Sequence, residues 1–211
     1  MSDQAAQRPD RRAEVAERLR GAVERLLREG ETYASLSIER LMNEAGLSRS
    51  TFYAYFTDKG DLLRQWSTHA SDATRAAAAA WVALGPDVSR QQLRAALRRL
   101  IGDYQPHARV TAAIYDATVY DAALATETRA VMDAHRRHLA DHVRRGQDEG
   151  WIDPALLPDE TAAWICWMTE RVLHQLVPDA DAPTVDELAD GLTGILWNVL
   201  YAPAGRTPAA A

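Results

Sequence analysis

Apolar residues recur every three or four positions along most of the chain, which is the spacing of amphipathic helices. Val15, Leu19, Val23 and Leu26 mark one face of a first helix, predicted near 11–29. No segment shows sustained alternation of apolar and polar residues bounded by turn residues, as a half-buried strand would. The pattern therefore predicts an all-α protein of about nine helices.

Short helices with clear start and stop signals follow the first one. Ser37 is the predicted N-cap of a helix that ends at Gly46, and Ser48 that of a helix that runs through Phe56. Two short helices joined by about four residues around a glycine fit a helix-turn-helix. We therefore predict a three-helix N-terminal domain over 10–58.

The helices that follow are longer and form a second predicted domain, over 59–202. Thr57 is the expected N-cap of a fourth helix that reaches about Leu84. An apolar stripe runs from Leu93 to Tyr104, and further helices are predicted over 108–120, 122–149, 160–177 and 184–201. The ends of the chain, 1–9 and 203–211, are expected to be disordered tails.

Composition adds limits to this picture. The chain has 47% hydrophobic and 26% charged residues, which is ordinary for a globular protein. No apolar run reaches the roughly 18 residues that span a bilayer, and the N-terminus has no signal-peptide core. The single Cys166 cannot form an internal disulfide, and we expect it to be a packing residue. We therefore expect a cytoplasmic protein without a membrane partner.

Charge is distributed unevenly. Residues 1–65 hold 11 basic and 11 acidic side chains, whereas the remaining residues carry the whole net charge of −6. A neutral head on an acidic body favours contact of the head with a polyanion, although the signal is weak by itself. The chain has no nucleophile elbow, phosphate loop or metalloprotease motif, so we predict that it is not an enzyme and needs no cofactor.

The predicted helix-turn-helix has a buried and an exposed side. The exposed side of its second helix carries Arg49, Ser50, Thr51 and Tyr53, and the N-terminal residues of that helix meet base edges in this motif. Arg49 can donate two hydrogen bonds to guanine, whereas tyrosines and lysines can donate to phosphates. Tyr55 fits the core and the DNA about equally well. The expected core residues are Ile38, Leu41, Met42, Leu47, Phe52 and Phe56, and the predicted contacts to double-stranded DNA are Ser37, Ser48, Arg49, Ser50, Thr51, Tyr53, Tyr55 and Lys59.

The segment "SIERLMNEAGLSRSTFYAYFTDKGDLL", residues 37–63, resembles the N-terminal domain of TetR-family transcriptional regulators. Met42 stands where alanine is usual in that family, and Ser50 where glycine is frequent, which leaves the base preference open. The resemblance implies a homodimeric repressor that a small lipophilic or aromatic effector releases from a palindromic operator. A regulator without an effector, controlled by abundance or a protein partner, is the alternative. The matching residues are Ala45, Gly46, Leu47, Ser48, Thr51, Phe52, Tyr53, Tyr55, Phe56, Lys59 and Leu62.

The resemblance also implies a C-terminal domain that binds ligand and dimerises. Gly191 and Gly194 lie inside the last predicted helix, where close approach of another helix would compensate their cost, so we expect dimerisation through the last two helices. Thr169-Glu170-Arg171 stands where one branch of the family has asparagine-glutamate-arginine, and Trp197 and Tyr201 form a late tryptophan-tyrosine pair. With these residues the C-terminal half most resembles the branch that contains the actinobacterial repressor of ethionamide activation. The residues expected to line the ligand channel are Leu93, Leu97, Leu100, Tyr104, Met132, His135, His138, Trp164, Thr169, Leu173 and Trp197.

Three histidines fall on one face of a predicted helix. His135, His138 and His142 have the spacing i, i+3, i+7, which would suit a transition metal. The resemblance instead places the first two on the channel side, and a solvated polar face beside several arginines is the third interpretation. We expect no metal site.

Overall fold

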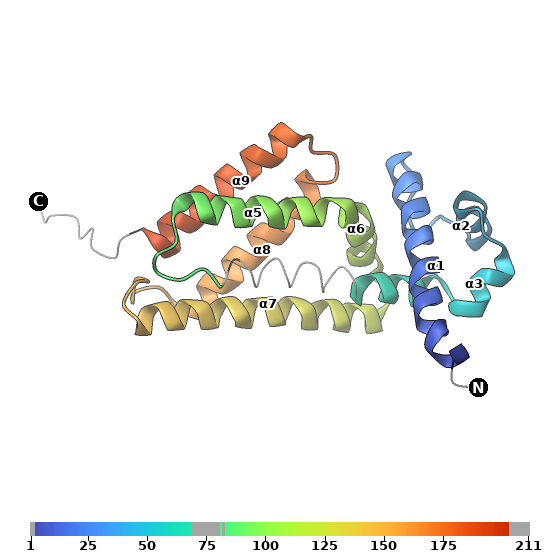
Figure 1. The fold of residues 1–211 in the computed structure, drawn as a ribbon, viewed down its shortest axis with the longest axis horizontal. Coiled ribbons are helices and arrows are strands. Elements are labelled where there is room, and N and C mark those ends of the chain that lie inside the picture. Colours follow the sequence, from blue (N-terminus) through green and yellow to red (C-terminus); the bar gives the residue numbers. More distant parts are fainter. Residues whose placement is uncertain (1–2, 69–80, 82, 203–211) are drawn as a thin grey trace, which may run out of the picture. The chain divides into compact units, whose positions relative to one another are not determined.

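A computed structural model of the chain describes residues 3–68, 81 and 83–202 (Figure 1). These residues contain no strand, so the predicted all-α class is confirmed. A further helix begins at residue 59, and its described part runs to 68. The labelled helices are α1 (Asp3–Arg28), α2 (Ile38–Ala45), α3 (Arg49–Tyr55), α5 (Arg90–Tyr104), α6 (Ala108–Ala117), α7 (Ala122–Asp148), α8 (Pro158–Leu176) and α9 (Ala182–Leu196), with a 3-10 turn at Gln105–His107 and a π-helical turn at Trp197–Tyr201.

Two boundaries differ from the prediction. α1 begins at Asp3, so residues 3–9 are helical rather than a disordered tail. Asp58, not Thr57, caps the helix that follows α3, because its Oδ1 accepts the Asp61 amide at 2.7 Å while Asp61 Oδ2 accepts the Thr57 amide at 3.1 Å. The predicted course of this helix over 69–80 and the predicted tail at 203–211 lie outside the described residues.

The chain divides into two compact units. The first comprises 1–71 and 107–128, and it contains the whole predicted helix-turn-helix. α1 runs through its core and packs on both α2 and α6. Two buried hydrogen bonds fasten α1: the Trp66 indole donates to the Ala16 carbonyl at 2.9 Å, and the Val110 amide donates to Glu24 Oε1 at 3.1 Å.

The second unit comprises 72–106 and 129–211. α5 and α9 pack against each other in it, and their outer edges are joined by ion pairs from Arg94 to Asp190 and from Arg98 to Asp186. The core beneath includes the leucine stripe of α5. None of the helices in the described part of the chain combines the length and apolarity needed to cross a bilayer.

Candidate nucleic-acid interface

The helix-turn-helix is built by local signals in the sequence. Ser37 caps α2 by accepting the Arg40 amide at 3.0 Å. Gly46 ends α2 in the left-handed conformation, with φ of 63°, which costs residues with a Cβ about 1–2 kcal/mol. From α1, the Arg18 guanidinium donates to the carbonyls of Ala45 at 3.0 Å and Gly46 at 3.4 Å. The turn that sets the angle between α2 and α3 is therefore held from both sides.

Serine and threonine hydroxyls cluster where α3 begins. Ser48 is the N-cap, and its Oγ accepts the Thr51 amide at 3.1 Å. The same oxygen lies 2.8 Å from both Ser50 Oγ and Thr51 Oγ1. Both predicted caps of this motif are therefore confirmed, and the three hydroxyls form one network at the exposed start of the helix.

The two sides of α3 separate as expected. Phe52 has no exposed surface, Phe56 is 1% exposed, and their ring centroids lie 5.6 Å apart in the core of the first unit. Tyr53 is 49% exposed on the opposite side of α3. Tyr55 lies between these extremes, half-buried against the core. The predicted inward and outward residues are thus distributed correctly, and Tyr55 remains divided between the two roles.

Arg49 differs from the arginines around it. Its guanidinium carbon lies 5.6 Å from the centre of the Tyr53 ring, a cation–π arrangement that keeps both groups on the exposed face. Within the part of the chain that the structure describes, no carboxylate pairs with Arg49, whereas Arg25 pairs with Glu44 and Arg40 with Glu31. Arg49 is therefore a cation available to an external partner.

Lys59 has a structural role that the sequence did not indicate. Its Nζ donates to the carbonyls of Tyr33, Ala34 and Leu36 at 2.9, 3.1 and 2.6 Å, and the Tyr33 hydroxyl donates back to the Lys59 carbonyl at 2.9 Å. Burial lowers the pKa of Lys59 and raises that of Tyr33. All three ammonium hydrogens have protein acceptors, so Lys59 fastens the α1–α2 connection, and its contact with phosphate stays a prediction.

The residues expected to line a ligand channel lie in different environments. Leu93 and Leu97 have no exposed surface and belong to the core of the second unit, so a ligand reaches them only if that core opens. Trp164 is 79% exposed, whereas Thr169 and Leu173 line a pocket of about 200 Å³ formed by α5, α8 and α9. Leu100, Tyr104 and Met132 are buried, His135 and Trp197 are half-buried, and His138 is exposed.

The three histidines of α7 do not converge. His142 is 1% exposed, and its Nε2 lies 3.0 Å from the Tyr201 hydroxyl. In the described residues, no group of three histidine, cysteine or acidic side chains is placed to hold a metal ion. Cys166 is half-buried against the core, where burial raises the pKa of its thiol to about 11, which fits a packing role.

Large apolar side chains are exposed on both α8 and α9. Trp164 is 79% exposed, Trp167 50% and Ile195 45%, which is unusual for side chains of this size. Gly191 lies one helical turn before Ile195, and a Cβ added there would have nothing within 4 Å. The surface thus offers both apolar groups and room for a close neighbour.

Sequence reasoning missed Glu24 and Trp66 as residues that join α1 to the rest of its unit. Glu24 is 8% exposed, and its burial raises the pKa of its carboxyl, although the Val110 amide opposes this shift. The available signal was an acidic residue among the apolar positions of an amphipathic helix, next to Val23. That pattern indicates that the Glu24 side chain is buried, but it does not identify the Val110 amide as its hydrogen-bond donor.

Similarity to known proteins agrees with this geometry. Residues 20–65 match the family model of bacterial regulatory proteins of the tetR family, and no curated protein sequence matches the chain. The TetR-family regulator PfmR from Thermus thermophilus is 19% identical, with a TM-score of 0.71 over 88% of this chain and 99% of that one. The MbdR regulator from Azoarcus sp. CIB is 17% identical, with a TM-score of 0.70 over 89% and 100%.

A third solved structure is that of AibR in complex with isovaleryl coenzyme A and operator DNA. It is 17% identical to this chain, with a TM-score of 0.65, and the match covers 90% of this chain and 99% of that one. At these identities the likeness establishes the fold. The protein thus has the fold of TetR-family transcriptional regulators, and residues 20–65 match the sequence model of that family.

Proposed function

We propose that the protein is a sequence-specific transcriptional regulator that binds a palindromic operator as a homodimer. The observation that carries the proposal is the exposed face of α3, where Arg49 and Tyr53 stack on each other beside the hydroxyl cluster of Ser48, Ser50 and Thr51. Arginine donates to guanine in the major groove, and the hydroxyls suit phosphates and bases. The family match over 20–65 supports this assignment.

Dimerisation through α8 and α9 is the second part of the proposal. Burying Trp164, Trp167 and Ile195 against a twofold copy would remove apolar surface from water, worth about 25 cal/mol per Å². The open space at Gly191 lets a partner helix approach closely. Two recognition helices one turn of DNA apart, roughly 34–36 Å, would then read successive major grooves of a palindrome.

The proposal extends to a small lipophilic effector that releases the protein from DNA. Its support is the fold shared with AibR, whose structure holds isovaleryl coenzyme A and operator DNA, and the apolar pocket lined by Thr169 and Leu173. Gly191 and Ile195 line the same pocket, so the proposed dimer would cover its mouth. Glu170, Arg171, Trp197 and Tyr201 also match the ethionamide-activation branch, whereas Thr169 stands where that branch has asparagine. The buried state of Leu93 and Leu97 favours the alternative, a regulator without an effector.

The test is selection of DNA fragments from a random pool by the full-length protein, followed by sequencing. The proposal expects enrichment of an inverted repeat with half-sites about one helical turn apart. Compounds would then be screened for the ability to release the protein from the enriched fragments, which tests for an effector. Recovery of fragments without a shared sequence would overturn sequence-specific binding, and a shared sequence without inverted symmetry would overturn the dimeric mode.

A further inference from the structure

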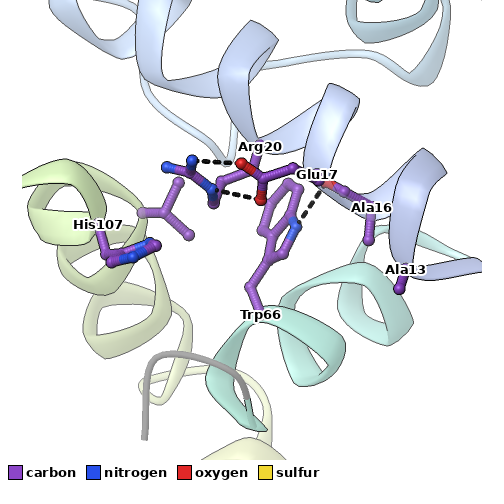
Figure 2. A pocket seen from close by; sticks show the side chains of 7 residues that line it. Ala13, Ala16, Glu17, Arg20, Trp66 and His107 are labelled. Atoms are coloured by element: carbon purple, nitrogen blue, oxygen red, sulfur yellow. Dashed lines mark hydrogen bonds and ion pairs between the residues drawn. The ribbon is translucent and has the colours of Figure 1, made fainter. Parts of the chain in front are cut away.

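A second cavity lies wholly within the first unit, bordered by α1, the helix that begins at residue 59 and the start of α6 (Figure 2). Its volume of about 300 Å³ equals that of roughly ten water molecules and falls at the lower end of small-molecule sites. Its apolar side is formed by Ala13, Ala16, Trp66 and Val110. The small side chains of α1 leave this space open.

The polar side consists of planar groups whose charges cancel. Arg20 donates to both carboxylate oxygens of Glu17, from Nε at 2.9 Å and from Nη2 at 2.5 Å. In Figure 2 Trp66 and His107 come from different elements, and the Trp66 ring lies directly below this ion pair. The lining therefore combines an indole, an imidazole and a guanidinium with alanine methyl groups, and the guanidinium already has its counter-charge.

We propose that this cavity binds an uncharged aromatic molecule of one or two rings. Indole and imidazole rings pack favourably against aromatic rings, and a guanidinium stacks on their faces. An ionic ligand would gain little here, because Glu17 and Arg20 neutralise each other. The volume admits a molecule of one or two rings.

The cavity lies beside the two hydrogen bonds that fasten α1. Val110 and Ala16 line it, and the same residues bond to Glu24 and Trp66 through their backbones. A bound ring would lie against both residues whose backbones make these hydrogen bonds, and α1 in turn contacts the helix-turn-helix through Arg18. Binding is independent of the proposed function, whereas an effect on DNA affinity rests on it.

The experiment uses indole as the probe and the full-length protein labelled with 5-fluorotryptophan. Trp66 is the one tryptophan of the first unit, and the other five lie in the second, so the Trp66→Phe variant assigns its fluorine resonance. We expect indole to shift the Trp66 resonance saturably. In Ala13→Leu the added methyl groups occupy the cavity and should weaken this response by about tenfold or more.

Ala123→Leu is the matched control, since it makes the same change at an exposed alanine of the same unit. It should respond to indole as the wild type does. If Ala13→Leu does not fold, Ala13→Val fills less of the cavity and should weaken indole binding by a smaller factor. An unshifted Trp66 resonance up to the solubility limit of indole, or an equal response in the filled variants, overturns the site. Operator affinity with and without indole is measured separately, so a failed DNA assay leaves the binding result decisive.

Discussion

The exposed face of α3 and the exposed face of α8 and α9 differ in the chemistry that they offer. On α3, the Arg49 guanidinium lies over the Tyr53 ring and offers hydrogen-bond donors. The exposed side chains of α8 and α9, Trp164, Trp167 and Ile195, offer mainly apolar surface. Water hydrates these donors in the free protein, and their most favourable partners are the acceptor oxygens and nitrogens of phosphates and base edges. Exposed hydrocarbon gains by burial. The chemical nature of the exposed groups, rather than their exposure alone, therefore indicates what each face binds.

The two faces are also supported differently. α3 is short, and its position depends on a few local features. These are the N-cap, the left-handed Gly46, and the hydrogen bonds that Arg18 and Lys59 donate to backbone carbonyls. α8 and α9 are longer helices that pack over one core. Small changes should thus alter the geometry of the α3 face, while the α8–α9 face should yield mainly to steric obstruction.

The largest effect is expected from Gly191→Leu. The glycine has open space in one protomer, so leucine should leave the fold unchanged but prevent close approach of a partner helix. A monomer has only one helix-turn-helix to bind the two half-sites, so its affinity for a full palindrome should fall by about 100-fold or more. Analytical ultracentrifugation and operator titration would measure both quantities.

Gly102→Leu is the matched control for this change. Gly102 is an exposed glycine inside α5, and a Cβ there also meets nothing within 4 Å. This variant should remain dimeric and bind the operator normally. A Gly191→Leu protein that stays dimeric would place the self-association surface elsewhere.

The next effect concerns Lys59→Ala. Three backbone carbonyls lose a charged donor, and the free energy of unfolding should fall by about 1.5–3 kcal/mol. Tyr33→Phe removes one reciprocal hydrogen bond and should cost about 1 kcal/mol. Urea titration measures both variants. A different result would be unchanged stability together with a flatter salt dependence of DNA binding. Lys59 would then be a phosphate contact that acts alongside the exposed residues of α3.

Arg49→Ala tests the base-reading part of that face. Operator affinity should fall by roughly 5- to 150-fold, the equivalent of about 1–3 kcal/mol for one bidentate contact, and preference at one base position should relax. Arg99→Ala is the control, because Arg99 is 79% exposed on α5 in the other unit. If Arg49→Ala and Tyr53→Ala both bind as the wild type does, α3 is not the recognition helix.

Local signals made the helix-turn-helix predictable. Ser37, Gly46 and Ser48 each act within a few residues, so their capping roles follow from the sequence itself. Thr57 and Asp58 are adjacent residues that can both cap a helix, and Asp58, the stronger N-cap residue type, accepts the Asp61 amide. Local rules thus identify the cap to within one residue, and the intrinsic preference for aspartate over threonine agrees with the residue that is used.

The body was less predictable because three environments select the same residue types. A core, a ligand channel and a dimer interface all require apolar side chains at helical spacing. Leu93 lies in the core, Leu173 lines a pocket and Trp164 is exposed, although all three were expected in one channel. Periodicity identifies the apolar sides of a helix, but not what covers each side.

The smallest effect is a pH dependence centred on Glu24, which accepts the Val110 amide and so joins α1 to α6. Burial raises the pKa of its carboxyl in the folded state, so folding favours the protonated form. This contribution to stability is fully present below the unfolded-state pKa near 4.3 and is lost as pH rises through the folded-state value.

Glu24→Gln keeps an oxygen acceptor for the Val110 amide and cannot ionise. Wild-type stability relative to this variant should therefore decline as pH rises from about 4 to 7, measured by urea unfolding at each pH. Glu14→Gln, at an exposed position of α1, should show no such trend. A difference that grows with pH would mean that the Val110 amide and the nearby arginines outweigh burial, and that α1 is held by a charged carboxylate rather than a neutral one.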